Sequence, residues 1–352
     1  MSTFDLLADL PLEVESYELE GLQANVSSGF ERLSTVVRLR GGGFDGVGED
    51  VVYDAADHVA MQRAGAMQPL AGSYALAEFC ELIDRLDLFP VEPEHGEVSR
   101  LYRRWTFHSA ALDLALRQAG RSLQDALGRE ARPLTFVVSL RLGEPPTFEP
   151  ISRRTSHYPS LRFKLDATSS WTPELIAELA ASGTVDSIDF KSFYRGTPVD
   201  QQPDPVLYER VVAAFPDAWL EDPDVATAAT AAALADVHDR ITWDAPIHSI
   251  GDIEALPFAP RMVNIKPSRI GGLKRLCDTY DYCAAHAIGA YGGGQFELGP
   301  GRGQAQYLAS LFHPDAPNDL APASFNAPDP QPGLPVSPLQ VAAHATGFRW
   351  GD

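Results

Sequence analysis

The stretch Met262-Val263-Asn264-Ile265-Lys266 is the last of four short apolar runs, each of which is closed by a charged residue. The three earlier runs are Ser187-Ile188-Asp189-Phe190, Ala218-Trp219-Leu220-Glu221 and Ile241-Thr242-Trp243-Asp244. Their charged residues follow one another at intervals of 32, 23 and 22 positions. One strand, one helix and two loops of a (β/α)8 barrel occupy roughly 30 residues. This rhythm therefore predicts successive strands of a TIM-type barrel.

The four charged residues also predict where the chemistry of such a barrel takes place. Side chains at the carboxyl ends of parallel barrel strands converge on one mouth. The carboxylates of Asp189, Glu221 and Asp244 would meet there, and Lys266 would place an amine beside them. Carboxylate oxygens are the ligands that hard divalent cations prefer. The pattern indicates a hard-cation site with a base next to the ion.

The composition narrows the class of protein. A chain of 352 residues with 45% hydrophobic residues suits a barrel plus a second module. No run approaches the roughly 18 apolar residues of a membrane span. A membrane is therefore not an expected partner. A net charge of −20 would repel nucleic-acid phosphates, so a nucleic acid is not an expected partner either. The first residues lack the pattern of a signal peptide, and three cysteines form no paired set, which favours a reduced, cytoplasmic protein.

The first part of the chain predicts a separate α+β module. Period-two alternation over residues 14–19 and 35–40 is typical of half-buried strands. The glycine-rich segment 41–49 lacks the Lys-Ser/Thr pair of a phosphate loop, so a tight hairpin is the preferred interpretation. Apolar residues at helical spacing predict helices over residues 74–86 and 105–127. The β-rich run 134–140 then opens the barrel.

The segment Arg162-Phe163-Lys164-Leu165-Asp166 adds charge to the predicted mouth. Alternation along a strand sends Arg162, Lys164 and Asp166 to one face. The next strand end points Asp189 and Lys191 together in the same way. Opposite charges could then pair across the two strands, Asp166 with Lys191 and Lys164 with Asp189. Structural ion pairs at a barrel rim are the simpler alternative, although burying so many charges without a function is costly.

Several motifs together resemble the enolase superfamily, and within it the muconate-lactonizing and mandelate-racemase branches. Asn264-Ile265-Lys266-Pro267-Ser268-Arg269-Ile270-Gly271-Gly272-Leu273 is similar to the strand-six lysine motif and is the most specific signal. Glu221-Asp222-Pro223 resembles the strand-four metal motif, and Gly293-Gly294-Gln295-Phe296-Glu297-Leu298-Gly299 resembles the segment after strand seven. The segments Gly46-Val47-Gly48-Glu49 and Ala110-Ala111-Leu112-Asp113-Leu114-Ala115 resemble the hairpin and the helix of the family's N-terminal domain.

The resemblance implies a fold, a cofactor and a reaction. It implies an N-terminal α+β capping domain over residues 1–130, a (β/α) barrel over 131–325, and a tail over 326–352 that returns to the cap. It implies Mg²⁺, with Mn²⁺ as a substitute, on Asp189, Glu221 and Asp244. A base would remove the proton α to the carboxylate of a small substrate through an enediolate, giving isomerisation, epimerisation or dehydration. A homo-oligomer is the default expectation for such a chain.

The same resemblance assigns roles to the remaining site residues. Lys266 carries the role of the strand-six acid/base, and Lys164 and Lys191 are the other candidates for a catalytic lysine. The predicted substrate-binding residues are Asp166, Glu297 and Arg162. Glu297 fits equally well a carboxylate that caps a loop.

Three departures from the family pattern leave alternatives open. Asp166 stands where the second lysine of strand two is expected, Lys191 where an asparagine is expected, and Ala245 where a glutamate is expected. The base could have moved to Lys191 with Asp166 as its partner, or Lys164 could serve as the base. Another alternative is a catalytically inactive barrel that keeps metal or small-acid binding. A sugar-acid dehydratase of the racemase branch is disfavoured, because the resemblance implies a strand-end histidine base near position 291 and Tyr291 stands there instead.

Overall fold

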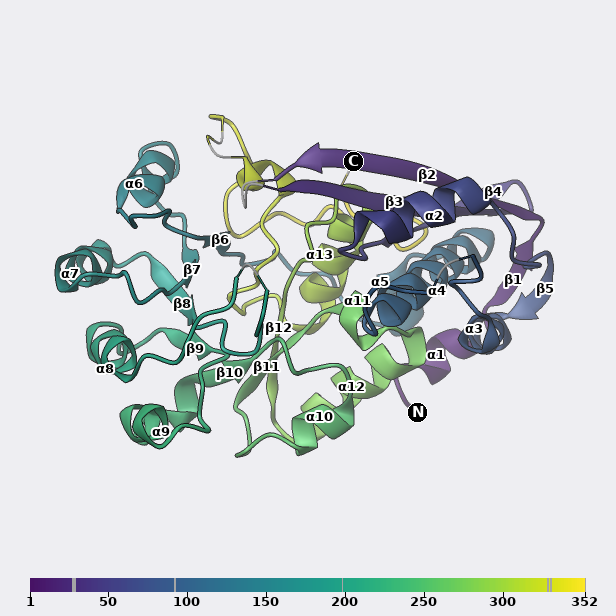
Figure 1. The fold of residues 1–352 in the computed structure, drawn as a ribbon. Helices are drawn as coiled ribbons and strands as arrows, with labels where there is room; N and C mark the ends of the chain where they lie inside the picture. The colour runs from purple at the N-terminus through teal and green to yellow at the C-terminus, as the bar shows by residue number, and fades with distance from the viewer. Residues whose placement is uncertain (27–29, 92, 198, 328, 330, 352) are drawn as a thin grey trace.

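The computed structural model describes residues 1–26, 30–91, 93–197, 199–327, 329 and 331–351. Figure 1 shows two halves, with the first part of the chain on the right and a curved parallel sheet with its helices on the left. None of the helices in the described residues combines the length and the apolar character that a membrane span needs.

The N-terminal half is an α+β domain built on two antiparallel sheets. Its elements are α1 (Asp5–Ala8), β1 (Pro11–Val14), β2 (Ser16–Asn25), β3 (Glu31–Gly41), β4 (Phe44–Asp50), α2 (Ala55–Ala64), β5 (Gly72–Ala75), α3 (Leu76–Arg85), α4 (Ser99–Gln118) and α5 (Leu123–Leu127). Strands β2, β3 and β4 form one sheet, and β1 pairs with β5 in the other. The single helix expected over 105–127 is two helices, because Gly120 at φ 63° ends the first and Ser122 caps the second.

The glycine-rich segment forms the predicted hairpin and also explains how closely strand β4 packs against helix α4. Gly42 and Gly43 adopt φ of 57° and 78° in the two-residue turn between β3 and β4, a conformation that favours glycine. A Cβ on Gly46 would lie 2.2 Å from the Ala110 carbonyl oxygen, and one on Gly48 would lie 2.0 Å from that of Thr106. The glycines therefore let strand β4 lie directly against helix α4.

The second half is the predicted barrel. Its elements are β6 (Val138–Leu140), α6 (Glu149–Thr155), β7 (Phe163–Asp166), α7 (Pro173–Ser182), β8 (Val185–Asp189), α8 (Pro205–Ala214), β9 (Trp219–Glu221), α9 (Ala228–Leu234), η1 (His238–Arg240), β10 (Ile241–Trp243), α10 (Ile250–Glu254), β11 (Met262–Ile265), α11 (Pro267–Ile270), α12 (Leu273–Ala285), β12 (Gly289–Gly292), α13 (Pro300–Phe312) and η2 (Ala323–Asn326). Strands β6 to β12 form one parallel sheet in chain order.

A short segment closes this sheet where an eighth strand would lie. Asn318 bridges in parallel to Phe136, just before β6, and Asp319 bridges in parallel to Gly293, just after β12. The predicted TIM-type architecture with an N-terminal α+β cap is therefore confirmed. The sheet register brings the strand ends level, because Asp166 pairs with Asp189 and Asp189 pairs with Glu221.

The last part of the chain runs back along the barrel to the N-terminal half. Leu339 bridges to Leu134 at the start of the barrel. Farther on, the Phe348 ring packs edge-on against Trp105 of α4, and the buried Asp113 carboxylate accepts the Phe348 N–H at 2.8 Å. This segment links the two halves of the molecule.

Candidate active site

Two carboxylates and a lysine lie together at the carboxyl end of the sheet. Asp189 ends β8 and Glu221 ends β9, and both side chains are fully buried. The Lys164 ammonium, from β7, lies 3.1 Å from Asp189 Oδ2, hydrogen-bonds Glu221 Oε1 and lies 3.6 Å from Asp319 Oδ2. The predicted pairing of Lys164 with Asp189 is confirmed. Burial opposes the charge of this lysine, but Glu221 and Asp189 outweigh it and raise its pKa well above the usual range.

The two exchanged residues, Asp166 and Lys191, form the second predicted pair. Lys191 Nζ lies 3.5 Å from Asp166 Oδ1 and also contacts Asp189 Oδ2. Lys191 adopts φ of 53°, an uncommon backbone conformation for a side-chain-bearing residue, in the turn that follows β8. Its N–H donates to Asp189 Oδ1 at 2.9 Å, which closes this turn. Burial opposes the Lys191 charge, yet Asp166 and Asp189 raise its pKa well above the ordinary value.

The structure differs from the expected trio of carboxylates. Three buried residues, Asp189, Glu221 and Asp222, place carboxylate oxygens within 4.8 Å of one another. Asp244 is expected in this set, but its Oδ2 accepts Lys266 Nζ at 2.8 Å and its Oδ1 accepts Arg269 Nη1 at 2.5 Å. These two cations occupy both of its oxygens.

Asp222 joins the trio because of an unusual backbone conformation. It follows β9 at φ 49°, and its carboxylate accepts the N–H groups of Asp244 and Ala245, each at 2.9 Å. Burial raises the pKa of Asp222 to about 7, and the charges of Asp244 and Asp189 act in the same direction. The side chain therefore ties β9 to β10 and adds a third carboxylate to the acidic cluster.

The residues of the site carry more negative than positive charge. Six carboxylates stand against four cations, namely Asp166, Asp189, Glu221, Asp222, Asp244 and Asp319 against Lys164, Lys191, Lys266 and Arg269. With all groups ionised, the sum is −2. Buried charge without compensation is costly, and a single divalent cation has the charge needed to neutralise it. The donor set is entirely oxygen, which suits Mg²⁺ or Mn²⁺.

Lysine is concentrated at this site to an unusual degree. The chain has four lysines among its 28 lysine and arginine residues. Lys164, Lys191 and Lys266 all belong to the site, and their side chains are between 2% and 14% exposed. The fourth, Lys274, is on the surface of α12 and pairs with Asp278 at 2.6 Å. Arginine therefore supplies most of the positive charge elsewhere, and three of the four lysines lie at this site.

The environment of Lys266 differs from that of the other two lysines. Burial lowers its pKa, Asp244 opposes this, and the nearby charges of Arg269 and Lys164 lower it further. A Cβ on Gly293 would lie only 2.4 Å from Lys266 Cε, so glycine at this position leaves room for the lysine. Lys266 is thus the site lysine whose surroundings most favour the neutral, proton-accepting form.

The structure places three further side chains in the site, which the sequence did not identify as site residues. The Tyr291 hydroxyl, from β12, donates to Glu221 Oε2, and the Tyr194 hydroxyl donates to Asp244 Oδ2 at 3.2 Å. The Asn264 amide in β11 is buried, and neither of its polar atoms has a hydrogen-bond partner among the described residues. Asn264 precedes Lys266 by two residues, so strand alternation places it on the same face and could have identified it. Tyr194 lies in a loop, where no such pattern applies.

Two predicted substrate-binding residues have other surroundings. Arg162 precedes β7 and donates from Nε to Asp186 at 2.9 Å near the start of β8, so it lies at the opposite end of the strands from Asp166. The expectation that it shares the mouth is wrong, because the strand continues for four residues beyond it. Glu297 is buried and pairs with Arg302 at 3.0 Å, and it accepts the Gln295 N–H at 2.8 Å. Among the described residues these contacts favour the loop-capping interpretation.

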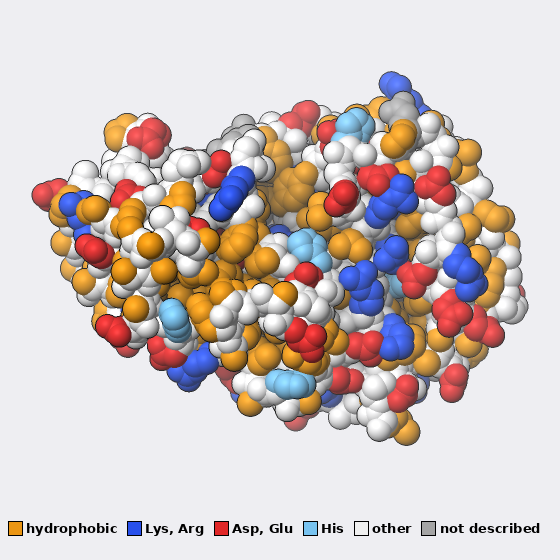
Figure 2. Space-filling model, turned by 60° about the horizontal axis from the view of Figure 1, so that its bottom comes forward, with side chains coloured by type: hydrophobic (Ala, Val, Ile, Leu, Met, Phe, Trp, Pro, Cys, Tyr) orange, Lys and Arg blue, Asp and Glu red, His pale blue; other side chains and the backbone are white. Residues whose placement is uncertain are grey.

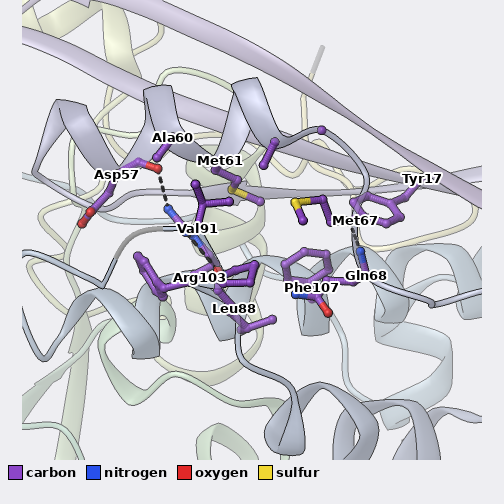
Figure 3. A pocket seen from close by; sticks show the side chains of 14 residues that line it. Tyr17, Asp57, Ala60, Met61, Met67, Gln68, Leu88, Val91, Arg103 and Phe107 are labelled. Carbon is purple, nitrogen blue, oxygen red and sulfur yellow. Dashed lines mark hydrogen bonds between the residues drawn. The ribbon is translucent and has the colours of Figure 1, made fainter.

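A separate pocket lies within the cap. Figure 3 shows Met61, Met67 and Phe107 among the side chains that line it. Two of its lining side chains are buried and charged: Arg103 already pairs with Asp50 at 2.8 Å and donates to the Asp57 carbonyl, and the Asp57 carboxylate pairs with His95 at 2.7 Å. The charged groups of this pocket are therefore already paired, and the pocket offers mainly apolar contacts. Figure 2 shows apolar side chains gathered over the barrel half and charged ones over the cap half, with a hollow where they meet.

Stabilisation of the protein by Mg²⁺ is expected to grow with pH. The Asp222 pKa of about 7 exceeds its unfolded value of about 3.9. Between these values the folded, metal-free protein keeps a proton that the unfolded chain loses, so this group makes stability fall as pH rises. Mg²⁺ competes with that proton, so saturating Mg²⁺ should add roughly 5 °C to the melting temperature at pH 8 and little at pH 5. Thermal melts with NaCl of equal ionic strength provide the control, and equal shifts at both pH values would contradict this expectation.

The barrel with its α+β cap has the same fold as solved members of the enolase superfamily. The structure of an enolase-superfamily member from Roseovarius nubinhibens ISM matches 97% of this chain and 94% of its own, with 21% identity and a TM-score of 0.67. A dipeptide epimerase from Methylococcus capsulatus, solved with Mg and the dipeptide L-Arg-D-Lys, matches 90% of this chain and 89% of its own, with 19% identity and a TM-score of 0.64.

The chain belongs to the family described as a domain of unknown function, DUF8230. The N-terminal domain of this family matches residues 5–126, and its C-terminal domain matches residues 130–327. An N-succinylamino acid racemase from Amycolatopsis is 42% identical over 71 residues, which are 20% of this chain. The match covers 18% of that relative's length.

Proposed function

We propose that this protein is a Mg²⁺-dependent isomerase that removes and returns the proton α to the carboxylate of a small substrate. The observation that carries the proposal is the placement of two lysines around one acidic cluster. Lys191 follows β8 and Lys266 follows β11, three strands further round the sheet. Lysines on two sides of a substrate carbon allow proton removal on one face and proton return on the other. The names of an epimerase with this fold and of a partially matching racemase support the same reaction class.

The two lysines are suited to complementary roles in the proposed reaction. The surroundings of Lys266 lower its pKa, so it can accept the α-proton. The carboxylates beside Lys191 raise its pKa, so it starts with a proton that it can donate. One enantiomer would be deprotonated by Lys266 and reprotonated by Lys191, which leaves Lys266 protonated and Lys191 neutral. The other enantiomer would react with that form of the protein, so that Lys191 accepts its α-proton and Lys266 returns one. Lys164 is held by three carboxylates and is assigned to charge balance.

The acidic cluster fits the proposed metal. Asp189 and Glu221, with Asp222 or Asp244, would hold Mg²⁺, and the bound ion would supply positive charge for the substrate carboxylate as negative charge develops on it. Asp166 sits beside Lys191 and is 17% exposed, whereas Asp189 is fully buried, and we assign it to contact with the substrate. The Tyr291 hydroxyl orients Glu221 from across the barrel.

Exchange of the α-proton with D₂O tests this function. Proton NMR would follow loss of the α-proton signal for a panel of N-acylamino acids and dipeptides, with Mg²⁺ and with EDTA. We expect exchange with at least one class of substrate, dependent on Mg²⁺ and lost in Glu221→Gln, with inversion at the same carbon. A product lacking water would instead indicate a lyase. Metal binding by calorimetry without exchange of any carboxylate would overturn the proposal in favour of a binding protein.

A further inference from the structure

The loop after β8 brings one tyrosine into the site between the two proposed proton-transfer lysines. The Ser192 N–H donates to the Asp222 carbonyl at 3.2 Å, and the Tyr194 N–H donates to the Lys191 carbonyl at 3.2 Å. The Thr197 hydroxyl donates to the Tyr194 carbonyl at 2.7 Å. These hydrogen bonds hold the backbone of Tyr194 on both sides, so its side chain has a defined direction.

The Tyr194 side chain contacts both halves of the charged site. Lys191 Nζ lies over its ring at 5.1 Å from the centroid, within the range of a cation–π interaction. Its hydroxyl donates to Asp244 Oδ2 at 3.2 Å, and the same oxygen accepts Lys266 Nζ at 2.8 Å. One aromatic residue is therefore in contact with one lysine and shares an acceptor atom with the other.

We propose that Tyr194 is a positioning residue, whose ring holds the Lys191 ammonium and whose hydroxyl holds the Asp244 carboxylate that binds Lys266. The inference rests on the proposed function for its catalytic meaning, but its structural part does not. Lys191 has a long side chain with freely rotating bonds, and Asp166 and Asp189 attract its ammonium from the carboxylate side. The face of the Tyr194 ring limits the movement of this ammonium on the opposite side. Misplacement of a reacting group by about 1 Å can cost about 10²-fold in rate.

Two substitutions separate the ring from the hydroxyl. Tyr194→Phe keeps the aromatic face toward Lys191 and removes the hydrogen bond to Asp244. Tyr194→Leu removes both. Any difference between the two variants therefore reports the ring, and any change common to both reports the hydroxyl. Tyr194→Trp, which restores an aromatic face, serves as the conservative rescue.

The four lysines of the chain make a direct spectroscopic test practical. With lysine labelled by ¹³C at Cε, the protein gives four side-chain signals, assigned by Lys→Met variants, and exposed Lys274 serves as the internal reference. We expect ring-current-shifted Lys191 ε-protons in the unmodified protein and in Tyr194→Phe, and a return toward the Lys274 position in Tyr194→Leu. The Lys266 signal should move in both variants. An unchanged Lys191 signal in Tyr194→Leu would overturn the proposal, whether or not the protein is an enzyme.

The kinetic arm uses a substrate identified in the D₂O exchange panel. We expect Tyr194→Leu to exchange the α-proton about 10–10²-fold more slowly than Tyr194→Phe for the enantiomer that Lys191 deprotonates, with a smaller difference for the other. Mg²⁺ affinity should be equal in the two variants, since both lack the hydroxyl. Equal rates in Phe and Leu variants for both enantiomers would overturn the positioning role. Absence of exchange in the unmodified protein would contradict the proposed function, while the lysine signals would still test the contact.

Discussion

Replacing Lys266 with methionine is expected to lower the rate of α-proton exchange by about 10³-fold or more for the enantiomer that this lysine deprotonates. A positioned acid or base contributes about 10²–10⁴-fold to such reactions. The effect should be this large because Lys266 is the site lysine whose surroundings favour the neutral form. Methionine fills a similar volume, so the barrel interior should stay packed. Proton NMR in D₂O with each enantiomer separately measures the loss.

The chain offers a matched control for this substitution. Lys274→Met removes the one lysine outside the site, where the side chain is 63% exposed and pairs with Asp278. It should leave the exchange rate and the Mg²⁺ affinity unchanged. Comparable losses of activity in both variants, or full activity in Lys266→Met, would contradict the assignment of Lys266 as a base.

Replacing Asp244 with asparagine is expected to lower the free energy of unfolding by about 3–5 kcal/mol in the absence of metal. The Asp244 carboxylate is the shared partner of two buried cations, Lys266 and Arg269. Removing its charge leaves the buried Arg269 guanidinium without the carboxylate that pairs with it, and takes the acceptor charge away from the Lys266 amine. The cost of stranding a buried charge exceeds the cost of losing the attraction itself. Urea unfolding of the two proteins measures the difference.

An exposed ion pair gives the comparison for this prediction. Asp239 pairs with Arg261 at 3.2 Å, and both side chains are more than half exposed. Asp239→Asn should change the free energy of unfolding by less than about 1 kcal/mol, because water screens such pairs. If the two substitutions proved equally mild, Asp244 would not be holding the buried cations together.

Much of the fold could be predicted because its signals are local. The charged strand ends at Asp189, Glu221 and Asp244 repeat with the period of a βα unit, and the structure places each at or just after the end of a strand. The glycines of segment 41–49 predicted a hairpin because two positive φ angles in a tight turn need them. The helix over 105–127 was predicted too long, since apolar periodicity continues across Gly120 while the backbone does not.

Pairing of charges across strands could also be predicted, because period-two alternation and strand order together set which side chains face one another. Lys164 with Asp189 and Lys191 with Asp166 follow from this rule. The same rule failed for Arg162, because alternation predicts the face of the sheet on which a side chain lies but not which end of the strand it lies near. Arg162 lies at the amino end and pairs with Asp186 instead.

The sequence by itself determined the barrel, its cap and the set of charged residues at one mouth, because each rests on periodicity or on the spacing of neighbouring strands. Only the tertiary structure decided how those charges share their partners. Asp222 joins Asp189 and Glu221 because its backbone adopts φ 49° just after β9. Asp244 instead pairs with Lys266 and Arg269. Tyr194 enters the site from a loop with no repeating pattern. Such contacts depend on side-chain reach in three dimensions, which the order of residues along the chain does not contain.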